Sequence, residues 1–236
     1  MITNYLFDVD GTLTPPRLSI EKDFEEFFYN WMQDKKVYLV TGSDLSKVKE
    51  QLSQRIIHSC SGLFCSMANE LYIGEEVIYK NELDLPIDLI SFLQEEIKRS
   101  TYPNICHDHF EFRTGMLNYS VIGRDCSQEG RLNYYAWDKE HKEREKIAAY
   151  INMHFDGVEA AVGGQISIDI QNKGNNKSLA SKWIRKNVGG QIVFFGDRTS
   201  KGGNDYDICE DIILNKDGRF FQINDQENII NILRSI

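Results

Sequence analysis

Two aspartates, Asp8 and Asp10, lie two residues apart at the end of an apolar run and directly before Gly11. Residues two apart in an extended strand point the same way, so we expect both acids at one strand tip. One acid can act as nucleophile or metal ligand while the other carries a proton, as phosphoryl transfer through an aspartyl-phosphate requires. Asp and Gly are also ordinary turn residues, so a solvated Asp-x-Asp-Gly turn is the alternative for this fragment alone.

Three short apolar runs predict the elements that would position such a site. Continuous apolar runs are typical of strands buried on both faces in a parallel sheet covered by helices, and helical patterns at 20–33 and 45–52 separate the runs. Ligands bind at the carboxyl ends of such strands. The three runs and the motifs that follow them are 4–7 with Asp8, 36–40 with Thr41-Gly42-Ser43-Asp44, and 191–195 with Gly196-Asp197.

The middle of the chain has a different pattern. Alternating apolar and polar residues there predict half-buried antiparallel strands, with helices on the apolar face and a polar face left open. We expect an α/β core with a parallel sheet from 1–81 and 173–236, and an inserted α+β domain with an antiparallel sheet from 82–172. The expected helices of the insert are 85–99 and 139–155, and its expected strands are 112–122 and 164–172.

The polar side of the insert carries residues suited to binding an anion. Arginine presents a planar fork of donors that matches phosphate, whereas surface salt bridges to the many acids are the alternative. The residues concerned are Arg113, Arg124 and Arg131, together with Asn118, Ser167 and Asp169.

The composition narrows the classes of protein. The chain has 236 residues and a net charge of −9, with 41% hydrophobic and 27% charged residues, as in an ordinary globular protein. No long basic block exists, so nucleic acid is not an expected partner. No apolar run approaches the roughly 20 residues of a membrane span, and the N-terminus lacks the layout of a signal peptide. Five irregularly spaced cysteines indicate free thiols in a reducing cytoplasm. For His107-Asp108-His109 a solvated loop is favoured over a metal pair.

The motif order resembles that of the haloacid dehalogenase (HAD) superfamily, and more closely that of the eukaryotic-type phosphomannomutases. The matches run from residue 6 to about 207, and those in the insert are the more specific. They are Phe7-Asp8-Val9-Asp10-Gly11-Thr12-Leu13-Thr14 with Pro16-Arg17, Gly42-Ser43-Asp44 with Lys47-Val48, Glu111-Phe112-Arg113 with Gly115-Met116-Leu117-Asn118, Ile122-Gly123-Arg124 with Cys126-Ser127-Gln128-Glu129 and Arg131, Gly163-Gly164-Gln165-Ile166-Ser167 with Asp169, and Phe194-Phe195-Gly196-Asp197 with Gly202-Gly203-Asn204-Asp205.

This resemblance implies a role for each matched residue. The implied nucleophile is Asp8, the implied general acid/base is Asp10, and Lys177 is expected to hold the transferring phosphoryl group together with Thr41 or Ser43. Mg2+ is expected at the Asp8 carboxylate, the Asp10 carbonyl and Asp197, with Asn204 and Asp205 in support. The implied substrate contacts are Arg17 near the domain junction, Arg113, Asn118, Arg124 and Arg131 for the non-reacting phosphate, and Ser167 and Asp169 for sugar hydroxyls.

The same resemblance implies a phosphomannomutase that interconverts mannose 6-phosphate and mannose 1-phosphate. It would work through an aspartyl-phosphate, with a hexose 1,6-bisphosphate as intermediate and activator, and would feed GDP-mannose synthesis in the cytoplasm. Hexose phosphates are the expected partners, and a homodimer through the insert, acting as a cap domain, is implied. A Mg-dependent HAD-type sugar-phosphate phosphatase is the alternative, and a non-catalytic binding protein on the same scaffold is a third hypothesis.

Three segments depart from the family's usual residues. The motif after the second apolar run is Thr41-Gly42-Ser43, where Gly-Gly-Ser is usual. The family has a Trp-Asp pair before the lysine, where this chain has Gly174-Asn175-Asn176 before Lys177. After Cys65 this chain has Ser66-Met67-Ala68-Asn69-Glu70, where a Glu-Asn-Gly element is usual. None of the three departures removes the nucleophile or the arginines.

Overall fold

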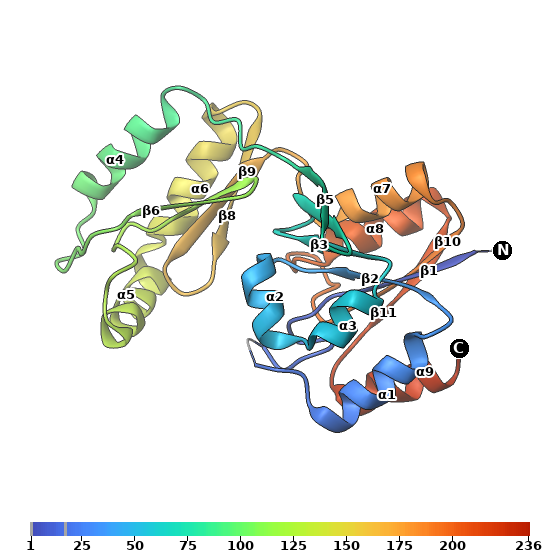
Figure 1. The fold of residues 1–236 in the computed structure, drawn as a ribbon. Helices are drawn as coiled ribbons and strands as arrows, with labels where there is room; N and C mark the ends of the chain where they lie inside the picture. Colours follow the sequence, from blue (N-terminus) through green and yellow to red (C-terminus); the bar gives the residue numbers. More distant parts are fainter. Residues whose placement is uncertain (1, 17) are drawn as a thin grey trace. The chain divides into compact units, whose positions relative to one another are not determined.

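The computed structural model describes every residue except 1 and 17, and it divides the chain into two compact units. Unit 1 combines Met1–Lys80 with Asn175–Ile236, and unit 2 is the intervening segment Asn81–Gly174. Figure 1 shows unit 2 in green and yellow, built around α4, α5 and α6. Each unit has its own hydrophobic core, so each is described separately below.

Unit 1 is built on a mostly parallel sheet, as the apolar runs predict. The described strands lie in the order β11-β10-β1-β2-β3-β4-β5. The first five run parallel, and β4 and β5 continue the sheet as antiparallel strands. Their bounds are β1 Thr3–Phe7, β2 Lys36–Val40, β3 Gly62–Cys65, β4 Glu70–Ile73, β5 Glu76–Lys80, β10 Gln191–Gly196 and β11 Gly218–Gln222. The expected α/β class is confirmed, although β3, β4, β5 and β11 were not anticipated.

Helices cover both faces of this sheet. On one face α1, α2, α3 and α9 pack in a core where Phe24, Phe28 and Met32, four residues apart, form the buried stripe of α1. On the other face α7 and α8 enclose a second core that includes Ile184 and Ile208. The bounds are α1 Lys22–Met32, α2 Leu45–Gln51, α3 Gln54–Ser59, α7 Ser178–Asn187, α8 Tyr206–Asn215 and α9 Gln226–Arg234.

Unit 2 has an antiparallel sheet with the described strands in the order β6-β7-β9-β8. Alternate residues of β7 and β9, among them Leu117, Tyr119 and Ile168, are fully buried in a core with the three helices. The antiparallel insert is therefore confirmed. The bounds are α4 Leu89–Arg99, β6 Phe110–Arg113, β7 Met116–Tyr119, α5 Gln128–His141, α6 Glu143–His154, β8 Val158–Gly163 and β9 Ser167–Asn172.

Two of the elements expected in the insert were wrong. The stretch 112–122 is not one strand, because Gly115 turns the chain at a φ of 67° and separates β6 from β7. The stretch 139–155 is not one helix, because Lys142 adopts the left-handed region with a φ of 57° and ends α5. The Asp138 carboxylate then accepts hydrogen bonds from the Arg144 backbone and side chain, which fixes the break between α5 and α6.

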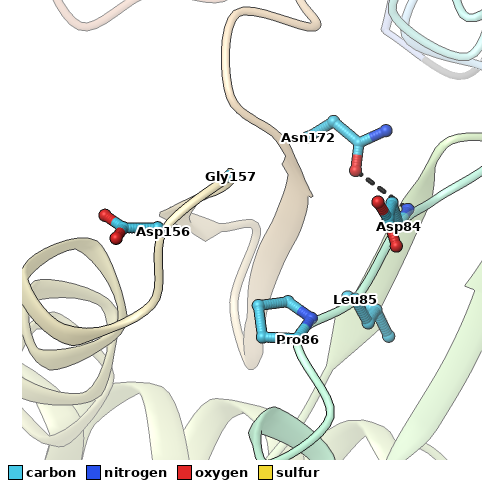
Figure 2. A pocket seen from close by; sticks show the side chains of 6 residues that line it. All are labelled: Asp84, Leu85, Pro86, Asp156, Gly157 and Asn172. Carbon is cyan, nitrogen blue, oxygen red and sulfur yellow. Dashed lines mark hydrogen bonds between the residues drawn. The ribbon is translucent and has the colours of Figure 1, made fainter.

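Asn172 ties together the two ends of the unit 2 segment. Its Oδ1 accepts a hydrogen bond from the Asp84 backbone amide at 3.0 Å, and its Nδ2 donates to the Glu82 carbonyl at 2.8 Å. Figure 2 shows the first of these bonds beside a pocket that Asp156 and Pro86 also line. The residues predicted to bind substrate do not line this pocket.

Two further properties follow from the described part of the chain. None of its helices combines the length and apolarity needed to cross a bilayer. All five cysteines are free thiols, and all but Cys106 are buried.

The core around α1 gives a first prediction. Phe28 is fully buried and contacts the rings of Phe7 and Trp31, so replacing it by Ala should leave a cavity. We expect Phe28→Ala to lower the free energy of unfolding by about 3–5 kcal/mol, measured by urea denaturation. The matched control is Leu214→Ala, because Leu214 in the same unit is 74% exposed and should change the free energy by less than about 0.5 kcal/mol. Equal effects of the two substitutions would contradict this packing.

Candidate active site

Lys177 joins two buried carboxylates in unit 1. Its Nζ donates to Asp8 Oδ1 at 2.5 Å and to Asp205 Oδ1 at 2.7 Å. Asp8 directly follows β1, Lys177 directly precedes α7, and Asp205 directly precedes α8. Lys177 and Asp205 are fully buried and Asp8 is 2% exposed. The ammonium therefore balances the charges of segments that are far apart in the sequence.

Asp197 completes a cluster of three acids at the carboxyl ends of the strands. Oxygen atoms of Asp8, Asp197 and Asp205 lie within 4.8 Å of one another. Gly11 lets Asp197 come this close, because a Cβ at position 11 would lie 2.4 Å from Asp197 Oδ2, and its φ is +82°. Asp205 is held in turn by the Arg198 backbone amide, which donates to its Oδ2 at 3.1 Å.

This cluster fits a divalent metal ion. The three carboxylates and one ammonium leave an excess of negative charge in a buried place, and oxygen-only donors suit a hard cation. Among the described residues, the buried oxygens that lack a hydrogen-bond partner include Asp8 Oδ2, Asp197 Oδ1 and Asn204 Oδ1. A cation is the partner that would satisfy them. Both Asp205 oxygens already accept hydrogen bonds, which suggests a supporting place for that residue.

Burial and the neighbouring charges shift the pKa values of this cluster. Burial raises the pKa of Asp8 to about 7, against the opposing effect of Lys177 and with a further rise from Asp205. Burial also raises the pKa of Asp197, and Asp205 adds to that rise. For Lys177 burial lowers the pKa, but Asp8 and Asp205 outweigh it, so the pKa is raised overall and the ammonium stays charged.

Among the described residues, a side chain from the loop after β2 and one from α2 both donate to Asp10. Its Oδ2 accepts from Ser43 Oγ at 3.2 Å, and its Oδ1 accepts from Gln51 Nε2 at 2.8 Å. The Thr41 Oγ1 is fully buried and accepts from the Ser43 backbone amide, which shapes the loop after β2. The structure thus brings together the expected core residues Asp8, Asp10, Thr41, Ser43, Lys177, Asp197 and Asp205.

A second polar cluster lies in unit 2, in one row across β6, β7 and β9. Glu111 pairs with Asn118, and Asn118 pairs with Asp169. The Asn118 Nδ2 donates to Asp169 Oδ1 at 2.5 Å, while Arg124 donates to Asn118 Oδ1 and forms an ion pair with Glu111. Arg113 also donates to Glu111, at 2.9 Å. Arg113 and Arg124 thus form the salt bridges of the alternative interpretation, and phosphate binding by these arginines stays a prediction.

The remaining predicted contacts of unit 2 lie around this row. Arg131 Nη2 donates to the Arg124 carbonyl at 2.5 Å, which ties α5 to the segment after β7. Ser167 is two residues before Asp169 on β9 and therefore shares its face, and its carbonyl accepts from Arg144. Arg17 lies outside the described residues. His109 Nδ1 pairs with the Ser120 carbonyl, and His107 and His109 join no metal cluster among the described residues.

The charges of this row are partly neutralised. Burial raises the pKa of Asp169, while Asn118 and the arginines oppose the rise. For Glu111 burial also acts to raise the pKa, but Arg113 and Arg124 outweigh it and the pKa is lowered. Glu111 is thus an anion that occupies guanidinium donors suited to phosphate.

Sequence reasoning missed two residues of these sites, Gln51 and Glu111. Gln51 is 2% exposed and directly contacts Asp10, and Glu111 was noted only as part of a motif. The signal for Gln51 is its place on α2: Val48 and Leu52 are buried, and position 51 falls on the same face. A polar residue on an apolar helix face needs a buried partner.

A parallel sheet with acids at its strand ends, a buried lysine and an inserted antiparallel unit make up a fold that solved haloacid dehalogenase-like proteins share. A haloacid dehalogenase-like hydrolase from Bacteroides thetaiotaomicron has the same fold at a TM-score of 0.66, with 12% identity over 100% of this chain and 99% of that chain. The family model described as eukaryotic phosphomannomutase matches residues 24–216. Phosphomannomutase 1 of Dictyostelium discoideum is 34% identical over 97% of this chain and 95% of its own length. A phosphomannomutase of Dendrobium officinale is 38% identical over 87% of this chain and 84% of its own length. The chain belongs to the eukaryotic phosphomannomutase family.

The contact between Gln51 and Asp10 gives a second prediction. We expect Gln51→Ala to lower kcat about 10–100-fold, because the carboxylate that exchanges a proton with the sugar would lose the donor that orients it. The measurement is steady-state kinetics with the folded variant. Gln33→Ala is the matched control, because the Gln33 amide donates to a backbone carbonyl on an exposed part of α1. A kcat of Gln51→Ala equal to that of the control would contradict a role of Gln51 in orienting Asp10.

Proposed function

We propose that this chain is a phosphomannomutase that interconverts mannose 6-phosphate and mannose 1-phosphate through a phosphate ester on Asp8. The observation that supports it best is the buried contact between Lys177 and Asp8, beside an acid cluster able to hold a metal. Family membership supports the sugar-phosphate substrate class. We propose unit 1 as the catalytic domain and unit 2 as the cap that recognises the substrate.

The first half-reaction would transfer a phosphoryl group from a hexose 1,6-bisphosphate to Asp8. An Asp8 carboxylate oxygen forms a bond to phosphorus, the bond from phosphorus to the sugar oxygen breaks, and Asp10 supplies the proton that this oxygen needs. In the second half, the hydroxyl of a hexose monophosphate gives its proton to Asp10 and takes the phosphoryl group back. Asp10 is suited to both steps because Ser43 and Gln51 hold its carboxylate in place.

Positive charge must balance the incoming phosphate against the acids. Lys177 would donate to the transferring group as a fixed charge in a dry place, and the Thr41–Ser43 loop would hold its oxygens. Mg2+ would be held by Asp8, the Asp10 carbonyl and Asp197, with Asn204 and Asp205 in support, and would neutralise charge on the phosphoryl oxygens. In unit 2, Arg113, Arg124 and Arg131 with Asn118 would bind the non-reacting phosphate, and Ser167 and Asp169 the sugar hydroxyls.

Further parts of the proposal rest on the family resemblance. They are a substrate contact by Arg17, a homodimer formed through the cap domain, a cytoplasmic location and a supply of mannose 1-phosphate for GDP-mannose synthesis.

A coupled assay with Mg2+ and a hexose 1,6-bisphosphate tests the reaction. We expect isomerisation of mannose 6-phosphate that depends on the bisphosphate, and loss of activity in Asp8→Asn. Steady release of inorganic phosphate without isomerisation would instead indicate a sugar-phosphate phosphatase.

Arg124→Ala separates the same two activities in a second way. We expect it to lower kcat/KM of the mutase at least about 100-fold, since a mutase must bind the second phosphate in each half-reaction. The matched control is Arg219→Ala in unit 1, whose guanidinium lies over the Phe221 ring. Unchanged activity of Arg124→Ala would contradict the role given to unit 2.

The raised pKa of Asp8 predicts how Mg2+ binding depends on pH. Because that pKa is about 7 in the folded protein without metal, Mg2+ must displace a proton at pH 6 but not at pH 8. We expect the dissociation constant to fall about tenfold between these pH values, measured by isothermal titration calorimetry. Asp8→Asn should bind Mg2+ more weakly and lose most of this dependence. A constant affinity over the range would contradict a protonated Asp8.

The raised pKa of Asp8 also determines how the free energy of unfolding changes with pH. The folded pKa of Asp8 lies above the ordinary value of 3.8, so the folded state binds more protons between these values. The contribution of Asp8 to the free energy of unfolding is therefore present below about pH 4 and is lost as the pH rises towards 7. Mg2+ should restore stability most strongly at the upper end of this range.

A further inference from the structure

A buried asparagine outside the predicted site connects two parts of it. Asn69 lies directly before β4 and is fully buried. Its Nδ2 donates to the Ser66 carbonyl at 2.9 Å, and its Oδ1 accepts from Asn175 Nδ2 at 2.8 Å. Both ends of one amide are therefore used, and they reach segments more than a hundred residues apart in the sequence.

On one side Asn69 supports a turn with an unusual backbone. Ser66, Met67 and Ala68 all adopt the left-handed region, with φ of 53°, 59° and 63°. Side-chain-bearing residues seldom do so in succession, so the surroundings must hold this turn. The Asn69 side chain caps it at the Ser66 carbonyl, and the Tyr79 hydroxyl donates to the Ala68 carbonyl.

The left-handed turn at 66–68 also holds the loop after β2. The Ser66 amide donates to the Ser43 carbonyl at 2.9 Å, and the Met67 amide donates to the Thr41 carbonyl at 3.0 Å. Thr41 and Ser43 belong to the loop that is proposed to hold the transferring phosphoryl group. The position of that loop therefore depends on the left-handed turn.

On the other side Asn69 reaches the segment that carries the lysine. Asn175 is two residues before Lys177, and the next residue, Asn176, accepts from the Ser178 amide and hydroxyl at the start of α7. The Lys177 side chain then extends to Asp8 and Asp205. The hydrogen bond to Asn175 thus sets where the backbone enters α7. It thereby also sets where the Lys177 ammonium lies.

We propose that Asn69 is a positioning residue that sets the phosphoryl-binding loop and Lys177 relative to one another. This proposal rests on the proposed function only for the identity of the transferred phosphoryl group. The contacts of Asn69 are independent of that function. Phosphoryl transfer depends on donors placed to within a fraction of an ångström, so loosening this link should slow the chemical step more than substrate binding.

Kinetics of Asn69→Ala, Asn175→Ala and the double variant provide the first test. We expect each single variant to lower kcat about 10–100-fold with KM changed less than about threefold, and the double variant to be no slower than the worse single one. Asn4→Ala is the matched control. Asn4 is equally buried in unit 1, and its amide donates to the Gly189 and Gln191 carbonyls. We expect Asn4→Ala to lower the melting temperature about as much as Asn69→Ala does, while kcat stays within about twofold of the wild-type value.

A second readout does not depend on turnover. In Asn175→Ala we expect the Ser66 and Met67 amides to exchange hydrogen for deuterium at least about fivefold faster, although these amides donate to the Ser43 and Thr41 carbonyls. Asn4→Ala should leave these amides unchanged. If the wild-type chain shows no mutase activity, the proposed function fails while this exchange experiment still decides the role of Asn69. Unchanged exchange at both amides, or additive losses in the double variant, would overturn the proposal.

Discussion

The structure of unit 1 depends on one buried charge balance, that of the Lys177 ammonium between Asp8 and Asp205. Burying a carboxylate is costly unless it is paired, and removing one partner of a buried pair leaves an uncompensated charge. The strands that bring Asp8 and Asp197 together also bring their charges together, and one lysine cannot balance all of them. A site built in this way is suited to binding a metal ion. It is also suited to a reaction in which a charged group moves from the substrate to the protein.

Close backbone approach makes this charge balance possible. The parallel sheet gathers the ends of β1, β2 and β10 at one edge, but side chains at the turns would keep the acids apart. Gly11 and Gly196 remove this obstacle, since a Cβ at either position would lie within 2.5 Å of a carboxylate oxygen of Asp197 or Asp205. Glycine is therefore required at these two positions because a side chain would clash with a carboxylate, and not only because glycine is frequent in turns.

Much of this site could be predicted because apolar runs locate strand ends, and strand ends locate Asp8, Thr41 and Asp197. Gln51 escaped prediction because its neighbour Asp10 is forty-one positions away, and only the packing of α2 places its amide there. The break at Lys142 was missed for a different reason. The left-handed conformation of a lysine has no composition signal, and the contacts of Asp138 with Arg144 that stabilise it are visible only in the fold.

Two of the three segments that differ from the expected family motifs are joined by one contact. Residues 66–70 and 174–177 are distant in sequence, yet the Asn69–Asn175 hydrogen bond joins them in the core of unit 1. A buried amide needs a complementary partner at each end, so a change in one segment limits which residue the other can carry. The Asn69–Asn175 hydrogen bond therefore makes the two segments depend on one another in this chain. Lys177 lies between Asp8 and Asp205, and the segment that leads to it is anchored by the contact of Asn175 with Asn69.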